Sequence, residues 1–434
     1  MLLYPRVQGN INFPTLMQKN LTEVGIMNQK IKTKIAIFCM SGLLMSALAI
    51  APSLANISAT FSQFSSSMVQ MLLSAPSLSS LVAALVVGRI TARIPKKTLA
   101  IIGIMLITLG GITPFFFHTS FYFLLGCATV LGFGVGTIMT ITPSIISENF
   151  SGEERGVIFG QMTAFVSIGA VILTVTGGKL AEYGWEYNYL AYLITLPLLF
   201  IICLCLPLNS AVYNEAPMSP ENSPSLPGIP SRVFIIGLCA FIFLLAYNAF
   251  PNNIALYLTT EKIGDITTAS HASALLLISG LISGLLFGHI SKITASGTLM
   301  MAFLVLGCGM GLTTLIKSPP MVLTGSFITG FSLSLFMARA PFLISTLVPI
   351  KSMPMAIAVF SIFTSVAGFT SPLIINNLAA LTGQETPRLA LIVSSLMALC
   401  GAFILLFSRF EKICLKNHSN HKKQNHEKLH KLER

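Results

Sequence analysis

Long apolar runs divide this sequence and limit what it can fold into. Each run holds about 20 or more mostly apolar residues, the length that an α-helix needs to cross the hydrocarbon of a bilayer. Short segments with charged, proline or glycine residues separate the runs. The twelve runs lie at about residues 35–56, 68–88, 98–117, 121–146, 156–178, 187–208, 232–258, 270–290, 297–317, 320–345, 353–378 and 387–408. Because the alternating pattern of a closed β-barrel is absent, we predict an all-α membrane protein with twelve transmembrane helices.

The composition excludes several classes of protein. Hydrophobic residues make up 54% of the chain and charged residues only 9%, whereas a soluble domain carries about 25% charged residues. No stretch resembles a nucleic-acid-binding patch on a soluble module. An enzyme embedded in the membrane would need clustered His, Asp or Glu inside the runs, and all 14 acidic residues can be placed outside the apolar cores. We therefore expect neither an enzyme, nor a cofactor, nor a nucleic-acid partner.

The Lys and Arg residues indicate the orientation. If both termini are cytoplasmic, 21 of the 26 Lys and Arg residues fall on the cytoplasmic side, as positively charged loops do in membrane proteins. We expect a monomeric, multi-pass protein of a bacterial plasma membrane that contacts lipid. The last segment carries four histidines: His418, His421, His426 and His430. Their spacing can suit a metal, but we prefer a solvated basic tail beside anionic lipid and expect no metal site.

A proline-rich segment divides the runs six and six. In residues 209–231 prolines recur at about every third position, which favours extended, solvated chain. The predicted organisation is a cytoplasmic segment at 1–34, a six-helix bundle at 35–208, a cytoplasmic linker at 209–231, a second six-helix bundle at 232–408 and a basic tail at 409–434.

The two halves repeat one another in sequence. The stretch LGFGVGTIMTITPSIIS (131–147) aligns with TGFSLSLFMARAPFLIS (329–345) at an offset of 198 residues, with six identical positions. The stretch LVVGRITA (85–92) aligns with LLFGHISK (285–292) at an offset of 200. Such duplication is typical of secondary transporters, whose binding site lies near the midplane between the repeats.

The loop GRITARIPKK (88–97) carries the most specific motif. Four of its residues fit one pattern: Gly88, Arg93, Lys96 and Lys97. With this loop the chain resembles the major facilitator superfamily over about residues 30–410. The resemblance implies two six-helix bundles with alternating access and a gating role for the four residues. Ala92 and Pro95 stand where the family has an acid and a second glycine. The alternative is that the charges only anchor the loop on the cytoplasmic side.

The stretch GAVILTVTGG (169–178) is similar to the signature of exporters in that family. Gly169, Gly177 and Gly178 fit the signature, and Leu173 and Thr174 do not. The resemblance implies export and a gating role for these glycines where the halves rock, because small residues let helices approach closely. Ordinary helix packing is the alternative.

Arg339 is a charge inside the tenth run. An arginine facing lipid costs about 2.5 kcal/mol or much more, so its side chain should face the interior or reach the inner surface. We consider three roles: a substrate-binding residue of the cavity, a gating partner of Glu148, or an interfacial anchor. As a substrate-binding residue it would favour an organic anion.

Further candidate binding residues are uncharged. Tyr247 and Asn248 lie beside Pro251 in the seventh run, and Gln161 lies in the fifth run at the depth of Arg339. The alternative for the first two is a kinked helix with amides at the outer interface. The spans also hold many Met and Phe residues, and a few of these can form an adaptable apolar cavity.

We predict a secondary active transporter that moves a small organic molecule by alternating access and exports it. A coupling ion is a further candidate partner, although no cavity carboxylate is evident in the sequence. One alternative is an importer or exchanger of an organic anion bound by Arg339. Another is a non-transporting receptor or sensor on the same scaffold, which would be expected to carry a substantial soluble domain.

Overall fold

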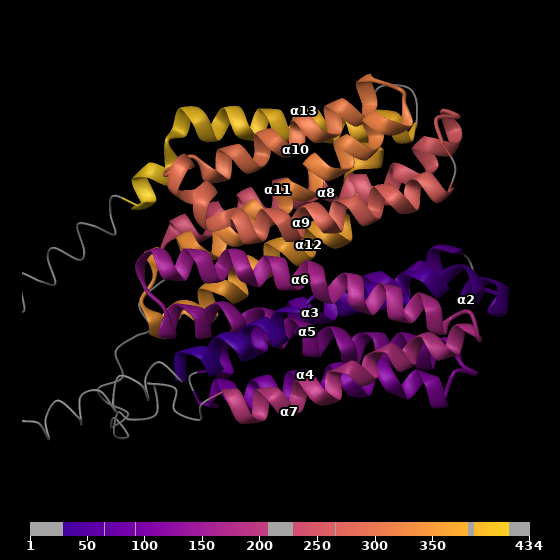
Figure 1. The fold of residues 1–434 in the computed structure, drawn as a ribbon, viewed down its shortest axis with the longest axis horizontal. Coiled ribbons are helices and arrows are strands. Elements are labelled where there is room, and N and C mark those ends of the chain that lie inside the picture. The colour runs from indigo at the N-terminus through magenta and orange to yellow at the C-terminus, as the bar shows by residue number, and fades with distance from the viewer. Residues whose placement is uncertain are drawn as a thin grey trace, which may run out of the picture.

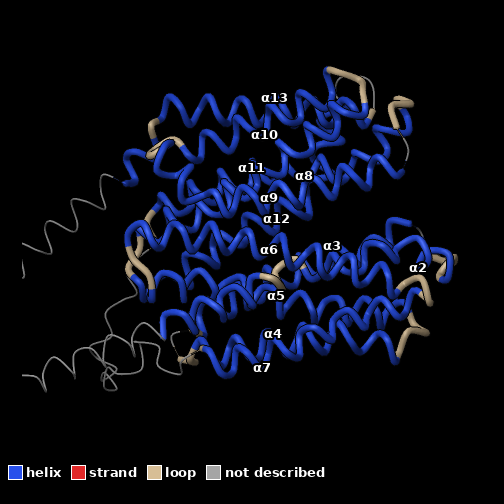
Figure 2. Tube along the Cα trace, in the orientation of Figure 1, coloured by secondary structure: helices blue, strands red, loops and turns tan. Residues whose placement is uncertain are grey.

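The computed structural model describes residues 29–64, 66–91, 93–206, 229–264, 266–380 and 386–415. Throughout these residues the chain is helical, without strands (Figure 2). Twelve helical segments of 18 to 30 residues are long and apolar enough to cross a membrane. This confirms the predicted fold class and the number of spans. Residues 1–28, most of the proposed linker, Ala92 and the tail histidines lie outside the described residues.

The N-terminal half contains the first six spans. Span one, Gln29–Ser53, is a helix over 29–41 followed by the 3₁₀ helix η1 (Ser46–Ser53), and the short α2 (Leu54–Thr60) extends it. The other five spans are α3 (Ser66–Ile90), α4 (Lys96–Phe116), α5 (Phe121–Asn149), α6 (Gly152–Leu180), and η2 (Trp185–Ile194) continued by α7 (Thr195–Cys205).

The C-terminal half contains the other six. They are α8 (Ser231–Thr260), α9 (Ile266–Thr294), α10 (Thr298–Leu315), α11 (Pro319–Leu347), η5 (Ile350–Ser352) continued by α12 (Met353–Ala380), and α13 (Pro387–Ser408). Arg409 follows in the left-handed conformation with φ 46°. This conformation turns the chain into a short helical stretch at 410–415, in which Glu411 and Cys414 are buried.

The helices of the two halves form two groups that lie against each other (Figure 1). Contacts between α3 and α12 and between α6 and α9 join them. One end of the bundle carries Lys96, Arg155, Lys292 and Lys351, and we call it the basic end. It lies at the left of Figure 1, where the two groups run close together, and their ribbons spread apart toward the opposite end.

Glycines allow the helices within each half to approach closely. A Cβ on Gly132 of α5 would lie 2.4 Å from the Cα of Pro76 in α3. A Cβ on Gly134 would lie 2.4 Å from the carbonyl oxygen of Gly103 in α4. Both distances are far below van der Waals contact, so α5 packs in the centre of its half because these positions lack side chains.

A row of glycines on α9 forms the main contact between the halves. Gly280, Gly284 and Gly288 recur every four residues and therefore lie on one face of the helix. That face packs on α6, where a Cβ on Gly284 would lie 2.6 Å from the backbone nitrogen of Ala164 and one on Gly288 2.9 Å from Cγ2 of Val157. On the other side of the interface, a Cβ on Gly88 of α3 would lie 2.8 Å from the Cβ of Ala358 in α12.

Replacing Gly132 by Ala should destabilise the protein. The added methyl group meets the backbone of α3, and overpacking of this kind costs about 1–3 kcal/mol. We expect a lower unfolding midpoint in detergent, measured by the loss of the monodisperse peak on heating. Gly126→Ala is the matched control on the same helix, because nothing lies within 4 Å of its added Cβ. Equal midpoints for the two variants would contradict the packing that we describe.

Candidate functional site

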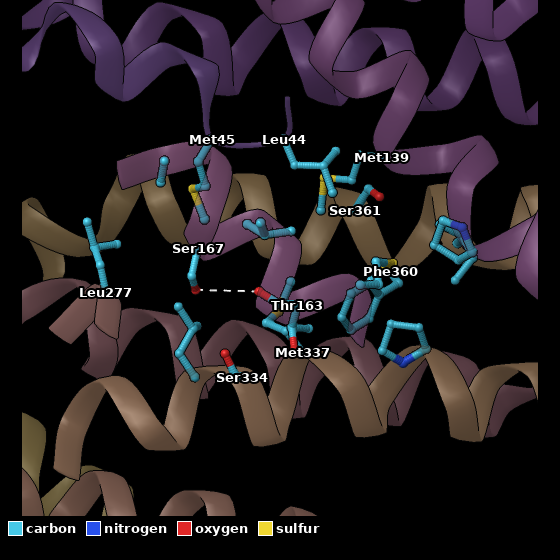
Figure 3. A pocket seen from close by; sticks show the side chains of 17 residues that line it. Leu44, Met45, Met139, Thr163, Ser167, Leu277, Ser334, Met337, Phe360 and Ser361 are labelled. Atoms are coloured by element: carbon cyan, nitrogen blue, oxygen red, sulfur yellow. Dashed lines mark hydrogen bonds between the residues drawn. The ribbon is translucent and has the colours of Figure 1, made fainter. Parts of the chain in front are cut away.

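A cavity lies between the two halves at the middle of the bundle. Its walls come from the first span, α5 and α6 on one side and from α9, α11 and α12 on the other. The empty volume is about 880 Å³, which includes space continuous with solvent. Four methionines line it: Met45, Met139, Met162 and Met337 (Figure 3). The cavity is therefore built from both repeats, as a site between the halves requires.

The lining of the cavity is uncharged. None of the described residues that line it is Asp, Glu, Lys, Arg or His. Its hydroxyl groups belong to Thr163, Ser167, Ser334 and Ser361. The first two donate to carbonyl oxygens of their own helix, Thr163 to Gly160 at 2.8 Å and Ser167 to Thr163 at 3.4 Å. Flexible, polarizable methionines adapt to apolar ligands, so the lining suits an uncharged, largely apolar molecule.

Equivalent positions of the two repeats meet at this cavity. Met139 and Pro143 in α5 correspond to Met337 and Pro341 in α11 at the offset of 198, and all four line the cavity. Proline has no N–H group, so the carbonyl of the residue four positions earlier loses its helical partner. That residue is the methionine in each case. The alignment of the repeats contained this signal, because both residue pairs are identical in it.

The uncharged residues named from the sequence lie outside the cavity lining. Tyr247 is buried within the C-terminal half, and the side-chain amide of Asn248 donates to the carbonyl oxygen of Leu244 at 2.9 Å. Gln161 is half-buried next to Met162, and only Met162 of the two lines the cavity. The structure therefore brings none of Tyr247, Asn248 and Gln161 into the site.

Arg339 also lies outside the cavity, in a buried network at the basic end. Its Nε donates to Oε1 of Glu411 at 2.5 Å, its Nη1 to Oγ of Ser291 at 3.0 Å and its Nη2 to the carbonyl oxygen of Ala295 at 2.5 Å. The other carboxylate oxygen of Glu411 accepts from the backbone N–H of Leu299 at 3.0 Å. The guanidinium thus joins α11 to the connection between α9 and α10 and to the chain after α13.

The contacts of Arg339 in this structure differ from those that its three considered roles assume. It does not line the cavity, its carboxylate partner is Glu411 and not Glu148, and with 3% of its surface exposed it does not reach the solvent. The physical reason is that a buried charge needs a partner. Glu411 becomes that partner because the left-handed turn at Arg409 brings the chain back against the bundle.

The proposed gating loop has one buried ion pair and one contact with the other half. Lys96 at the start of α4 donates to Glu148 near the end of α5, so this pair lies within the N-terminal half. Gly88 packs against α12 of the other half. Arg93 is exposed and Lys97 is half-buried. Among these residues, Gly88 is the one for which the structure gives a contact across the halves.

The three glycines of the exporter-like stretch pack within the N-terminal half. A Cβ on Gly169 would lie 1.9 Å from the carbonyl oxygen of Gly42, and one on Gly177 2.9 Å from that of Ala49. A Cβ on Gly178 would lie 3.6 Å from Pro52. They therefore pack α6 against the first span, whereas the glycines of α9 lie at the contact between the halves.

Arg155 joins the two halves at the basic end. Its Nε donates to the carbonyl oxygen of Phe150 at 2.8 Å and its Nη2 to that of Ser147 at 3.0 Å. Its Nη1 donates to the carbonyl oxygen of Ser345 at 3.1 Å in the other half. Ser147 and Ser345 are equivalent in the repeats, so one guanidinium satisfies the last carbonyls of both α5 and α11. In the sequence, Arg155 is distinguished from the other Lys and Arg residues expected on the cytoplasmic side by no motif.

Two further contacts join the halves at the basic end. Lys292 of α9 and Glu153 of α6 form an ion pair at 2.8 Å across the halves, but both are exposed and such pairs contribute little. The ring of Phe342 in α11 would lie 3.6 Å from a Cβ on Gly156 of α6, and the same ring packs against the guanidinium of Arg339 at 5.2 Å.

Arg155→Ala should separate the halves at the basic end in part of the molecules, because it removes the hydrogen bonds to Ser345. Spin labels at Thr98→Cys and Ile293→Cys, both on exposed positions, should then report an additional, longer distance by double electron–electron resonance. Arg89→Ala, an exposed arginine at the same end, is the matched control. If the distance distributions of both variants coincide with that of the parent, Arg155 does not hold the halves together.

Removing either partner of the Arg339–Glu411 pair should destabilise the protein. Glu411→Ala leaves a buried guanidinium without its carboxylate, a change that costs about 3–5 kcal/mol. The double variant Arg339→Met/Glu411→Leu should recover most of the loss, because it buries no charge. Unfolding midpoints in detergent measure both effects. The control is Glu261→Ala, which breaks the more exposed pair of Glu261 with Lys317 and should change little. Midpoints that are unchanged in Glu411→Ala would refute the structural role.

Comparison with known proteins places the chain in a family. The model of the Major Facilitator Superfamily matches residues 35–293 and 236–431. The putative glycerol-3-phosphate transporter 2 of Arabidopsis thaliana is 24% identical over 264 residues, 50% of this chain and 52% of that protein. The chain thus matches about half the length of this curated relative.

Several solved structures share the fold at low identity. The proton:xylose symporter XylE is 12% identical with a TM-score of 0.65, covering 88% of this chain and 95% of that one. The human organic anion transporter MFSD10 is 14% identical with a TM-score of 0.67, covering 88% and 98%. The Escherichia coli fucose:proton symporter FucP is 13% identical with a TM-score of 0.63, covering 88% and 98%. The match to the family model shows that this chain belongs to the Major Facilitator Superfamily, and the twelve spans and the sequence repeat agree with it.

Proposed function

We propose that this protein is a secondary transporter that exports small, uncharged and largely apolar organic molecules by alternating access. The observation that carries the proposal is the cavity between the halves, which four methionines line and no ionisable side chain enters among the described residues. Apolar lining with a few hydroxyl groups is the usual chemistry of a site for such ligands.

We further propose that the basic end is cytoplasmic. The helix ends and loops there carry Arg89, Arg93, Lys292 and Lys351, and Lys and Arg are enriched on the cytoplasmic side of membrane proteins. With that orientation, the contacts of Arg155 and of the α9 glycines close the cytoplasmic side. The structure then represents the outward-facing state, and its counterpart would open at the basic end.

An anionic substrate has less support. A carboxylate or phosphate held in the membrane needs a cation beside it, and Arg339 is already bound to Glu411 outside the cavity. The resemblance to a glycerol-3-phosphate transporter therefore does not lead us to propose a phosphate substrate. A coupling ion remains a further candidate partner, and a charged side chain that couples it would have to lie outside the cavity lining.

Export is the proposed direction because of the stretch that is similar to the exporter signature. Its Gly169 brings α6 against Gly42 of the first span. The cavity residues Leu44 and Met45 follow Gly42 closely, and Val166 and Ala170 flank Gly169. The glycines thereby position residues that line the cavity, so the exporter-like stretch lies beside the proposed substrate site.

A matched pair of dyes tests the substrate class in proteoliposomes. N-phenyl-1-naphthylamine is neutral and apolar, and 8-anilino-1-naphthalenesulfonate is its sulfonated analogue. We expect the neutral dye to cross several times faster than in empty liposomes, and the sulfonate to show no protein-dependent flux. Faster movement of the sulfonate would favour the organic-anion alternative. Comparing vesicles of the two orientations gives the direction.

Met337→Trp should strongly reduce the protein-dependent flux of the neutral dye, because the larger side chain narrows the cavity. Met71→Trp is the matched control, since Met71 is 46% exposed on α3 and lies outside the cavity lining. Full transport by Met337→Trp in protein that remains folded would show that the substrate passes elsewhere.

A further inference from the structure

One hydroxyl group in the cavity is buried without a partner. Ser361 of α12 lines the cavity and is 1% exposed (Figure 3). Its Oγ makes no hydrogen bond to any described residue. The hydroxyls of Thr163 and Ser167, which also line the cavity, donate to carbonyl oxygens of their own helix. Ser361 therefore differs from these two because its hydroxyl has no hydrogen-bond partner among the described residues.

The polar neighbours of Ser361 are already engaged. Thr364 donates to the backbone carbonyl oxygen of Ser361 at 3.0 Å, and the hydroxyl of Ser365 lies 3.5 Å from that of Ser80 in α3. A serine within a helix ordinarily satisfies its hydroxyl on the carbonyl three or four residues before it. Ser361 does not do so, and a buried polar group left without a hydrogen bond is unfavourable. A ligand group that hydrogen-bonds to the unpaired hydroxyl would remove this unfavourable contribution.

We propose that Ser361 determines substrate specificity by hydrogen bonding to a single uncharged polar group, a hydroxyl, carbonyl or amide, of an otherwise apolar substrate. This inference rests on the proposed function and refines its substrate class. Ile357 and Phe360, on the same helix, also line the cavity, and a hydrogen bond formed in apolar surroundings is stronger than one in water. A molecule that lacks the polar group leaves the hydroxyl unpaired and is bound less tightly.

The two ends of the substrate then have separate sites. The apolar body contacts the methionines of the repeated segments, Met139 and Met337, and the polar group contacts α12. The repeat places no unpaired hydroxyl at the equivalent position. At an offset of 198 this is Thr163, whose hydroxyl is paired with its own helix, and at an offset of 200 it is Gln161, which lies outside the cavity lining. The recognition of the polar group is therefore one-sided, which fixes the orientation of a bound molecule.

Binding of two near-isosteric probes tests the proposal. The probes are 1-naphthalenemethanol and 1-ethylnaphthalene, which differ in a hydroxyl against a methyl group. Equilibrium dialysis measures their affinity for the full chain in nanodiscs, with empty nanodiscs as the baseline. We expect Ser361→Ala to weaken binding of the alcohol about tenfold, as the loss of one neutral hydrogen bond does, and to leave the ethyl compound unchanged. Ser361→Thr should retain the preference for the alcohol.

Ser394→Ala is the matched control, because the buried hydroxyl of Ser394 donates to the carbonyl oxygen of Ala390 in α13, away from the cavity. It should change neither affinity. Without ligand, Ser361→Ala should raise the unfolding midpoint, since it removes an unpaired polar group, and Ser394→Ala should lower it. An unchanged ratio of the two affinities in Ser361→Ala would overturn the proposal and leave the proposed function standing. Failure of the unmodified protein to bind either probe would reject the substrate class and the role of Ser361 together.

Discussion

Close backbone contact between α6 and α9 is the interaction on which the site depends. Gly284 lets the backbones of the two helices meet, while Gly280 packs on the hydroxyl of Ser167 and Gly288 on the side chain of Val157. Farther from the basic end, Ser167 of α6 and Leu277 of α9 line the cavity. In a membrane the hydrophobic effect does not drive helices together, so close packing of small residues has to stabilise their association. The same glycines therefore join the halves beside the cavity.

The buried ion pairs and the uncharged cavity lie at different places along the bundle. Lys96 with Glu148 and Arg339 with Glu411 are buried pairs at the basic end, each within one half. The cavity between the halves is lined by methionines and hydroxyls. A buried pair resists change because breaking it leaves an uncompensated charge. Each half can therefore keep its own pair intact and move as a unit, while the weaker contacts between the halves exchange.

The fold could be predicted from the sequence to a large degree, and the site only in part. Apolar runs fix the spans because every backbone polar group in lipid must be satisfied internally. The repeat already aligned Met139 with Met337 and Pro143 with Pro341, which line the cavity. A charge such as Arg339 is conspicuous in an apolar run, whereas the uncharged residues that line the cavity resemble those that only pack the helices. The partner of Arg339 could not be predicted, because Glu411 reaches it only through the turn at Arg409, 70 residues further along the chain.

The hydrogen bonds of Arg155 are unequally shared between the halves, and in the alternating-access cycle that we propose this determines what must break when the halves part. Two of its acceptors, on Ser147 and Phe150, belong to its own half and can stay bound when the halves part. Only the bonds to Ser345 must be exchanged for water, at a net cost of about 1 kcal/mol for each. The guanidinium thus stabilises the conformation in which the halves are in contact at the basic end, but only slightly, so both conformations stay accessible in the proposed cycle. A ligand that distinguishes the two conformations by a few kcal/mol would be enough to redistribute the population between them.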